Sequence, residues 1–259
     1  YMIKIIYSGT GYGANYNRIY IDRIQGNGSC NGVLIQNGFS NEVYLGRIEN
    51  VVKGITIANN NGWSESTKIR NGLISASEYC VGFELLAGSY NSFVNTEIDS
   101  VGMGVYKYGV YIASGTYVES SVFVNVHGWA NANNTQLFHI EGPVPGVVII
   151  NPYFEDVNSQ YTGEALIYTT AGDFVLINPK AINLDKTVDS PNHSPFVMID
   201  SQYIYFANYS PAIYGGIKNY YDSTMVGFRL EGSADKVLNL FPQGRTDIVY
   251  YWQEMDTWR

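Results

Sequence analysis

The feature of this sequence that most restricts its fold is an asparagine that recurs at a nearly constant interval. It follows an apolar residue in the segments SFVNTEID, VFVNVH, VVIINPYFED and VLINPK, at Asn95, Asn125, Asn151 and Asn178. The separations are 125 − 95 = 30, 151 − 125 = 26 and 178 − 151 = 27 residues. Such a period, with short β-type runs and no helical pattern between the asparagines, indicates a solenoid in which each repeat makes one coil.

An asparagine at the end of each strand has a physical role in such a coil. Its backbone tolerates the left-handed region that a sharp bend requires, and stacked asparagine side chains can hydrogen-bond to one another along a ladder. Successive coils then lie about 4.8 Å apart along the axis, which is the spacing of paired strands. We therefore predict an all-β protein built as a parallel β-helix. The alternative is a β-sandwich in which four unrelated turns each carry an asparagine.

The register of the asparagine coils extends in both directions along the chain. It predicts eight coils, of which the first carries an apolar strand at residues 19–21 and the last at residues 204–206. A second strand recurs in the coils, from residues 33–35 to residues 196–198, and most of these strands adjoin a glycine that we expect at a tight corner. We predict a β-helix domain over residues 1–215 and a cap or oligomerisation segment over residues 216–259. Because the chain begins within the pattern, we expect it to be part of a longer protein.

Composition excludes several classes of partner. Charged residues make up only 15% of the chain, and its 23 tyrosines and 27 glycines suit a β-rich extracellular or virion protein. The net charge of −8 argues against nucleic acid, because a nucleic-acid-binding surface must neutralise phosphates. No apolar segment is long enough to insert into a membrane. No side-chain spacing matches a metal site and no glycine run matches a phosphate loop, so we expect neither a metal nor a cofactor.

The two strands of a coil are expected to present different outer faces, because alternate side chains point in opposite directions. The outward column of the first strand is predicted to be mostly apolar and therefore to be covered, either by a loop of the same chain or by another subunit. The outward column of the second strand is polar and aromatic at its centre, which suits a face that holds a sugar. The two predicted columns are Tyr20, Tyr44, Lys68, Phe93, Phe123, Ile149, Leu176 and Tyr205, and Leu34, Thr56, Glu84, Tyr111 and His139.

Taken together, the coil period and the segments VFVNVHGWA and VIINPYFED resemble the β-helix of bacteriophage tailspikes, and more broadly the pectate-lyase-like superfamily. The resemblance covers roughly residues 18–214. It implies a right-handed, single-stranded parallel β-helix that assembles as a homotrimer with its subunits side by side. It also implies a virion-attached, extracellular protein that binds and often cleaves a bacterial surface polysaccharide, either capsule or lipopolysaccharide. The calcium-dependent lyase motifs of the superfamily are not found in this sequence.

Hydrolysis in tailspike-like enzymes uses carboxylates from neighbouring coils, because one acid must protonate the leaving oxygen while a base or nucleophile acts across the sugar. Just past the asparagines, the register places Asp99 and Glu155 in one column, two coils and about 9.6 Å apart. Side chains could bring these carboxylates into the inverting range of about 6.5 to 9.5 Å. A second column contains Glu97, His127, Tyr153 and Lys180. The catalytic candidates are therefore Asp99, Glu155, Glu97 and His127, with His127 orienting a carboxylate, whereas Asp156 is expected to be merely solvated.

A competing cluster lies on the outer face of the second strand. It consists of Glu84, Tyr111, His139 and Glu141, which we expect to bind substrate. A His and Tyr pair there would also suit metal-free β-elimination, because one side chain can abstract a proton while the other protonates the leaving group. Trp129 lies in a polar turn, where its indole could stack on a sugar or pack against a neighbouring coil.

Three functions from different classes remain open on the sequence alone. The first is an endo-acting polysaccharide depolymerase, hydrolytic by preference and a lyase as the alternative. The second is a glycan-binding adhesin without catalysis, and the third is a structural spike of a virion or spore surface. Products released from a bacterial polysaccharide would separate the first function from the other two.

Overall fold

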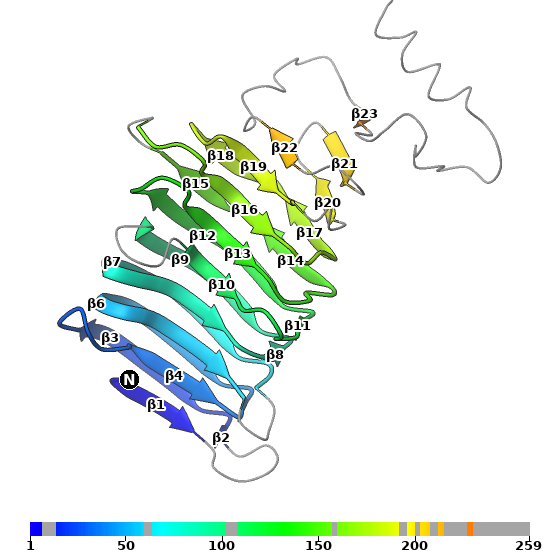
Figure 1. Ribbon diagram of the computed structural model, residues 1–259. Coiled ribbons are helices and arrows are strands. Elements are labelled where there is room, and N and C mark those ends of the chain that lie inside the picture. The colour runs from blue at the N-terminus through cyan, green and yellow to red at the C-terminus, as the bar shows by residue number, and fades with distance from the viewer. Residues whose placement is uncertain are drawn as a thin grey trace, which may run out of the picture.

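A computed structural model describes residues 1–6, 14–59, 64–101, 108–156, 160–191, 196–199, 203–207, 212–214 and 227–229. All the regular secondary structure in these residues is β. The strands stack in parallel as a solenoid of about six turns, which Figure 1 shows as successive rungs from β1 to β20. The predicted all-β, β-helical class is therefore confirmed.

The strands differ in length because some of them continue around a corner without interruption. In the first half of the solenoid they are β1 (Ile3–Ile6), β2 (Ala14–Asn15), β3 (Arg18–Gln25), β4 (Val33–Gln36), β5 (Gly38–Phe39), β6 (Glu42–Ala58), β7 (Lys68–Leu85), β8 (Gly88–Ser89), β9 (Ser92–Val101), β10 (Tyr108–Ile112) and β11 (Val118–Glu119). They continue as β12 (Val122–Ala130), β13 (Gln136–Ile140), β14 (Val147–Ile150), β15 (Tyr153–Glu155), β16 (Ala165–Thr169), β17 (Phe174–Ile177), β18 (Lys180–Ile182), β19 (Lys186–Asp189), β20 (Phe196–Ile199), β21 (Tyr203–Ala207), β22 (Ala212–Tyr214) and β23 (Gly227–Arg229).

Each turn of the solenoid has three faces. The first face precedes the asparagine corner and the second face follows it, as β14 and β15 do on either side of Asn151. The third face contains β1, β4, the ends of β6 and β7, β10, β13, β16 and β19, which pair with one another in that order. The residues past the asparagine were expected to form a bend, but they are β-strand: β6, β7, β9 and β12 continue through the corner, and β15 and β18 begin just after it.

The core consists of apolar columns that run along the axis. On the first face, Phe93 and Phe123 are register partners and stack with their ring centroids 4.5 Å apart. On the third face, Phe83 pairs with Val110, which pairs with Phe138. All five side chains are fully or almost fully buried. Each such burial contributes roughly 1.5 to 3 kcal/mol relative to an exposed side chain.

The asparagine corner has the predicted geometry. Asn95, Asn125, Asn151 and Asn178 have φ angles of 53°, 52°, 49° and 47°, in the left-handed region that asparagine tolerates. Their amides form a ladder, because Nδ2 of Asn125 donates to Oδ1 of Asn95 at 2.8 Å and Nδ2 of Asn151 donates to Oδ1 of Asn125 at 3.2 Å. Asn71 extends the column by one turn, with a φ of 51°.

The glycines that precede third-face strands are required by a close approach of backbones. A Cβ added to Gly54 would lie 2.5 Å from the carbonyl oxygen of Gly82, and one added to Gly82 would lie 2.9 Å from that of Gly109. Neighbouring coils therefore touch through bare backbone at this corner.

The outward column predicted for the first strand is wrong from Phe93 onward. The side chains of Tyr20, Tyr44 and Lys68 lie outside the core as predicted. The other members of the column for which burial is described lie inside the core: Phe93, Phe123, Ile149 and Leu176. The predicted register is off by one residue there, and a slip of one residue exchanges the two faces of a strand. The outer side of the first face is nevertheless apolar, because its half-buried ladder contains Val94, Val124, Ile150, Ile177 and Ile199.

The predicted eighth coil is also wrong. β21, which contains residues 204–206, runs antiparallel to β20 and so ends the parallel stacking. β20 itself continues the first face by pairing with β17, although residues 196–198 were predicted to belong to the second strand of a coil. Apart from β23, the predicted cap at residues 216–259 lies outside the described residues.

Candidate functional site

The third face presents the polar and aromatic column that the sequence predicted. The pairings Thr56–Glu84, Glu84–Tyr111 and Tyr111–His139 confirm its register. The structure extends the column by two turns, through Tyr168 and Asp189. Because the strands are parallel and in register, these side chains follow one another along the solenoid axis.

A second outward column lies three residues before the first one. It arises because two successive residues of a strand turn inward, as Leu137 and Phe138 do, both being fully buried. Residues on either side of such an irregularity share a face, as at a β-bulge. The pairs of side chains that meet in this way are Tyr108 with Tyr111, Gln136 with His139, and Lys186 with Asp189, whereas Lys53, three residues before Thr56, pairs with Glu84 of the next turn.

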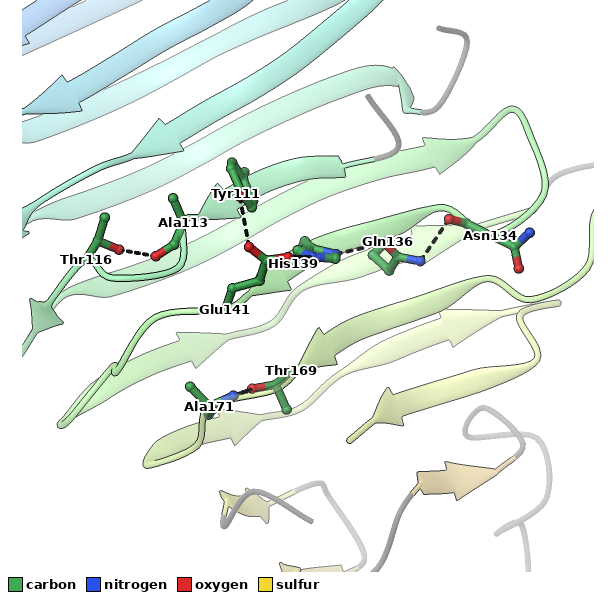
Figure 2. Close-up of polar contacts among 9 residues, drawn as sticks. All are labelled: Tyr111, Ala113, Thr116, Asn134, Gln136, His139, Glu141, Thr169 and Ala171. Carbon is green, nitrogen blue, oxygen red and sulfur yellow. Dashed lines mark hydrogen bonds and ion pairs between the residues drawn. The ribbon is translucent and has the colours of Figure 1, made fainter. Parts of the chain in front are cut away.

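The centre of the third face is a hydrogen-bonded chain around His139 (Figure 2). Its Nε2 lies 3.0 Å from Oε1 of Glu141, and its Nδ1 lies 3.1 Å from Oε1 of Gln136. The amide of Gln136 donates to the backbone oxygen of Asn134 at 2.8 Å, which fixes the amide's orientation. The second carboxylate oxygen of Glu141 accepts a 2.9 Å hydrogen bond from the hydroxyl of Tyr111. Glu141 therefore links side chains from β10 and β13.

The environment shifts the proton affinities of these groups. Burial lowers the pKa of His139, and the neighbouring Glu141 opposes only part of that shift. The hydrogen bond from His139 is the largest influence on Glu141 and, with that from Tyr111, lowers its pKa. Burial and the bond to Glu141 raise the pKa of Tyr111 to about 12. At neutral pH, Glu141 is therefore ionised and Tyr111 carries its proton.

Aromatic rings continue on both sides of this centre. The ring centroid of His139 lies 3.9 Å from that of Tyr108 and 4.7 Å from that of Tyr168, and Tyr108 also stacks on Tyr111 at 5.2 Å. His139 is only 7% exposed, so these rings shield it. The tyrosines are half-buried, and each offers part of a ring to solvent. The accessible part of the face is thus a row of tyrosines, which we call the tyrosine row: Tyr108, Tyr111 and Tyr168.

Ion pairs lie at both ends of the tyrosine row. Toward the N-terminus, Nζ of Lys53 lies 2.5 Å from Oε1 of Glu84, whose other oxygen accepts a 3.2 Å hydrogen bond from Thr56. Toward the C-terminus, Nζ of Lys186 lies 2.7 Å from Oδ2 of Asp189. Glu84 is only 5% exposed, so the prediction that it lies open for substrate is wrong. Its carboxylate is held within the protein.

The second face carries the other predicted cluster. His127 pairs with Glu97 on one side and with Tyr153 on the other, and Tyr153 pairs with Lys180, as predicted. The rings of His127 and Tyr153 lie 5.6 Å apart. His127 is exposed and Glu97 is half-buried, so both are accessible from solvent.

Trp129 is a register partner of Glu155 in the next turn, while Asp99 belongs to the turn before. The indole thus lies between the strands that bear the two carboxylates, and all three side chains are half-buried. The hydroxyl of Tyr153 donates to Glu155, and this bond raises the pKa of Tyr153 to about 12. Glu155 therefore has a fixed orientation beside an aromatic ring.

The expectation that Asp156 is solvated is wrong. Its side chain is completely buried, and its Oδ2 accepts a 2.9 Å hydrogen bond from the backbone nitrogen of Tyr161. Asp156 thus holds the backbone at Tyr161, and a substitution there would remove this hydrogen bond.

Several residues of the third face were missed by the sequence analysis. Tyr168 is the register partner of His139 in the next turn, but the predicted column ended at His139. The second column could have been found from polar or aromatic residues three positions before those of the first column. A pattern in which side chains strictly alternate between inside and outside does not predict them. The missed residues are Lys53, Tyr108, Gln136, Tyr168, Lys186 and Asp189.

Within the described part of the chain, no three His, Cys, Asp or Glu residues are grouped so that they could hold a metal ion. The same residues include no helix of the length and apolarity needed to cross a membrane. Comparison of the chain with protein-family models, with curated proteins and with solved structures found no match. The solenoid is thus established by the structure, and membership of the tailspike family stays a prediction.

Proposed function

We propose that this protein binds an extended bacterial surface polysaccharide along its third face. The observation that carries the proposal is the row of half-exposed tyrosine rings that continues over successive turns beside the carboxylate of Glu141. Aromatic rings stack on the apolar faces of sugars, while carboxylates and hydroxyls hydrogen-bond at the sugar edges. A solenoid repeats such groups along one axis, which suits a polymer whose units also repeat.

The test is retention of the purified protein on immobilised capsule and lipopolysaccharide, followed by analysis of the soluble products. Retention supports the proposed binding function. No retention on any bacterial polysaccharide would contradict it. New reducing ends indicate hydrolysis, and the ultraviolet absorbance of an unsaturated uronate indicates elimination.

Hydrolysis of the bound polysaccharide is the second candidate function, and the second face favours it. Asp99 and Glu155 belong to the turns on either side of the one that bears Trp129, and Tyr153 fixes the carboxylate of Glu155. One carboxyl group can act as the acid and the other as the base or nucleophile on a sugar that stacks on the indole. On the third face, by contrast, Glu84 is paired with Lys53 and Asp189 with Lys186, so among the described residues of that face the carboxylates nearest to Glu141 are engaged in ion pairs.

We further propose that three copies of the chain associate side by side, in the setting of a phage tail. The support is the apolar outer side of the first face, where Val94, Val124, Ile150 and Ile177 form a continuous ladder of half-buried aliphatic side chains. Contiguous apolar surface of this kind marks an interaction site, because exposing it to water is unfavourable.

The oligomeric state can be measured by light scattering on the wild-type protein and on the double variant Val124→Glu/Ile150→Glu. A trimeric wild type and a folded monomeric variant would support this arrangement. A wild type that remains monomeric at micromolar concentration would contradict it.

A further inference from the structure

We propose that the polysaccharide bound by the third face is uncharged where it contacts the tyrosine row. This inference rests on the proposed binding function and specifies its substrate class. The neutral units expected there are hexoses or N-acetylhexosamines, not uronates, sialates or phosphorylated sugars. The argument depends on which charges of the face are already neutralised.

In the described part of the third face the cations are few, and those near the tyrosine row are engaged in ion pairs. Among the described third-face residues the basic side chains are Lys4, Lys53 and Lys186. Lys53 is paired with Glu84 at 2.5 Å and Lys186 with Asp189 at 2.7 Å. Lys4 lies four strands from Tyr111, which is about 19 Å at the spacing of paired strands. Among the residues that the structure describes, a carboxylate or phosphate on the ligand would therefore find no available cation beside the row.

The charge that does lie beside the row is negative. Glu141 is ionised and its side chain is 32% exposed, and both of its oxygens already accept hydrogen bonds within the protein. An anionic sugar stacked on Tyr111 would bring a second negative charge close to it, at the edge of a low-dielectric surface where repulsion is poorly screened. The same position is favourable for a hydroxyl, because a carboxylate oxygen can accept more than one hydrogen bond.

The uncharged groups of the face complement a polyhydroxylated chain. The half-exposed tyrosines supply ring surface on which sugars can stack. The carboxylates of Glu141 and Asp189, which belong to different turns of the solenoid, supply acceptors for sugar hydroxyls. Elimination would not occur on such a ligand, because that reaction needs a uronate whose carboxylate acidifies the neighbouring proton. Any cleavage of this substrate is therefore hydrolytic.

The first experiment is an array of bacterial surface oligosaccharides that includes neutral, uronate-bearing, sialylated and phosphorylated members. Retention of neutral members at a signal at least tenfold above their acidic counterparts is expected. Retention confined to acidic members would overturn the uncharged-ligand inference and leave the proposed binding function intact. An array without any retained member would overturn both.

A matched pair of polymers removes the influence of sugar sequence. One uronate-containing capsular polysaccharide is compared with the same polymer after its carboxyl groups have been reduced to alcohols. The carboxyl-reduced form should bind at least tenfold more tightly, with an affinity nearly independent of salt between about 50 mM and 500 mM because no ion pair forms. Tighter binding of the unreduced form, weakened by salt, would show that a cation of the face recognises the acid.

Two variants test the neutralised lysines directly. Asp189→Asn removes the carboxylate that pairs with Lys186, and Glu84→Gln removes the carboxylate that pairs with Lys53, so each should increase affinity for the unreduced acidic polymer several-fold. Circular dichroism and thermal unfolding establish that each variant is folded, and either variant alone is sufficient for the test. If a folded variant gains no affinity for the acidic polymer, the pairing does not control the charge preference and the inference is wrong.

Discussion

Nε2 of His139 lies 3.0 Å from Oε1 of Glu141, while Nδ1 of the same ring lies 3.1 Å from Oε1 of Gln136. An imidazole with an oxygen acceptor at each nitrogen is best satisfied when both nitrogens carry a proton. Burial acts in the opposite direction and lowers the pKa of His139. The two effects compete within one ring, so the ring's protonation couples the third face to pH.

The first prediction concerns acid stability. Because the pKa of folded His139 lies below its ordinary value of 6.5, the unfolded chain takes up this proton first, and the free energy of unfolding falls as pH decreases below 6.5. Glu141, with its pKa below 4.5, contributes stability above pH 4.5 that is lost at still lower pH. His139→Gln should reduce the slope between pH 7 and 5, by at most about 1.4 kcal/mol per pH unit for one proton. Denaturant titrations across this range measure the slope, and His127→Gln, on the exposed second face, is the control.

The second prediction concerns Glu164, whose carboxyl oxygens are buried without a hydrogen-bond partner from another residue. Burial, with a smaller influence of Asp185 and Asp156, raises its pKa to about 7. The folded state therefore holds this proton longer than the unfolded state, so stability is full below pH 4.5 and declines as pH rises to about 7. Glu164→Gln should stabilise the protein at pH 8 by about 1 to 2 kcal/mol, allowing for residual solvation, and have little effect at pH 4.5.

Chemical denaturation at pH 4.5 and pH 8 tests this prediction. Glu65→Gln, at a half-buried glutamate, is the matched control for the loss of one carboxylate. A Glu164→Gln protein that is less stable than wild type at pH 8 would mean that the carboxylate has a partner of opposite charge in solution.

The third prediction separates the two roles of the corner asparagines. Asn125→Gly keeps the left-handed backbone but removes amide bonds to Asn95 and Asn151, which contribute about 0.5 to 1.5 kcal/mol each. Asn125→Ala also removes them and adds about 1 to 2 kcal/mol of backbone strain. The alanine variant should therefore unfold at a lower denaturant concentration than the glycine variant. Equal midpoints would show that the backbone at this corner relaxes without cost.

The fourth prediction concerns the tyrosine row. Tyr168→Ala removes a half-exposed ring that stacks on His139 at 4.7 Å. An aromatic contact of about 1 to 1.5 kcal/mol corresponds to a loss of glycan affinity close to tenfold. Tyr20→Ala removes an exposed ring from the first face and should leave affinity unchanged. Titration calorimetry with a retained polysaccharide measures both, and a larger loss in the Tyr20 variant would move the binding surface to the first face.

The fifth prediction concerns hydrolysis on the second face. Asp99→Asn and Glu155→Gln should each reduce the release of reducing ends at least about a hundredfold, the scale on which general acids and bases act. Polysaccharide binding should persist, because both substitutions preserve shape and polarity. Asp22→Asn, at an exposed position of β3, is the control, since the buried Asp156 is unsuitable. If Glu141→Gln abolishes cleavage while both other variants remain active, the reaction belongs to the third face.

The sequence by itself determined the repeating elements of the fold. The asparagine period and the alternation around it identify parallel coils, because a left-handed residue and an apolar pair recur wherever the chain turns the same corner. The same regularity correctly placed Glu84, Tyr111 and His139 in one column, since these strands keep constant spacing. Local patterns are visible in sequence because they depend on residues close together in the chain.

Only the tertiary structure decided which side chains meet. Loops of unequal length set the register between coils. An error of one residue in the predicted register placed Phe93 and Phe123 on the surface, whereas in the structure they lie in the core. The irregularity before each third-face strand brings Lys53 to Glu84 and Gln136 to His139, pairings that strict alternation forbids. Such contacts join residues from different turns or across a break in the strand's alternation, so they follow from the stacking of coils and not from the pattern within any one of them.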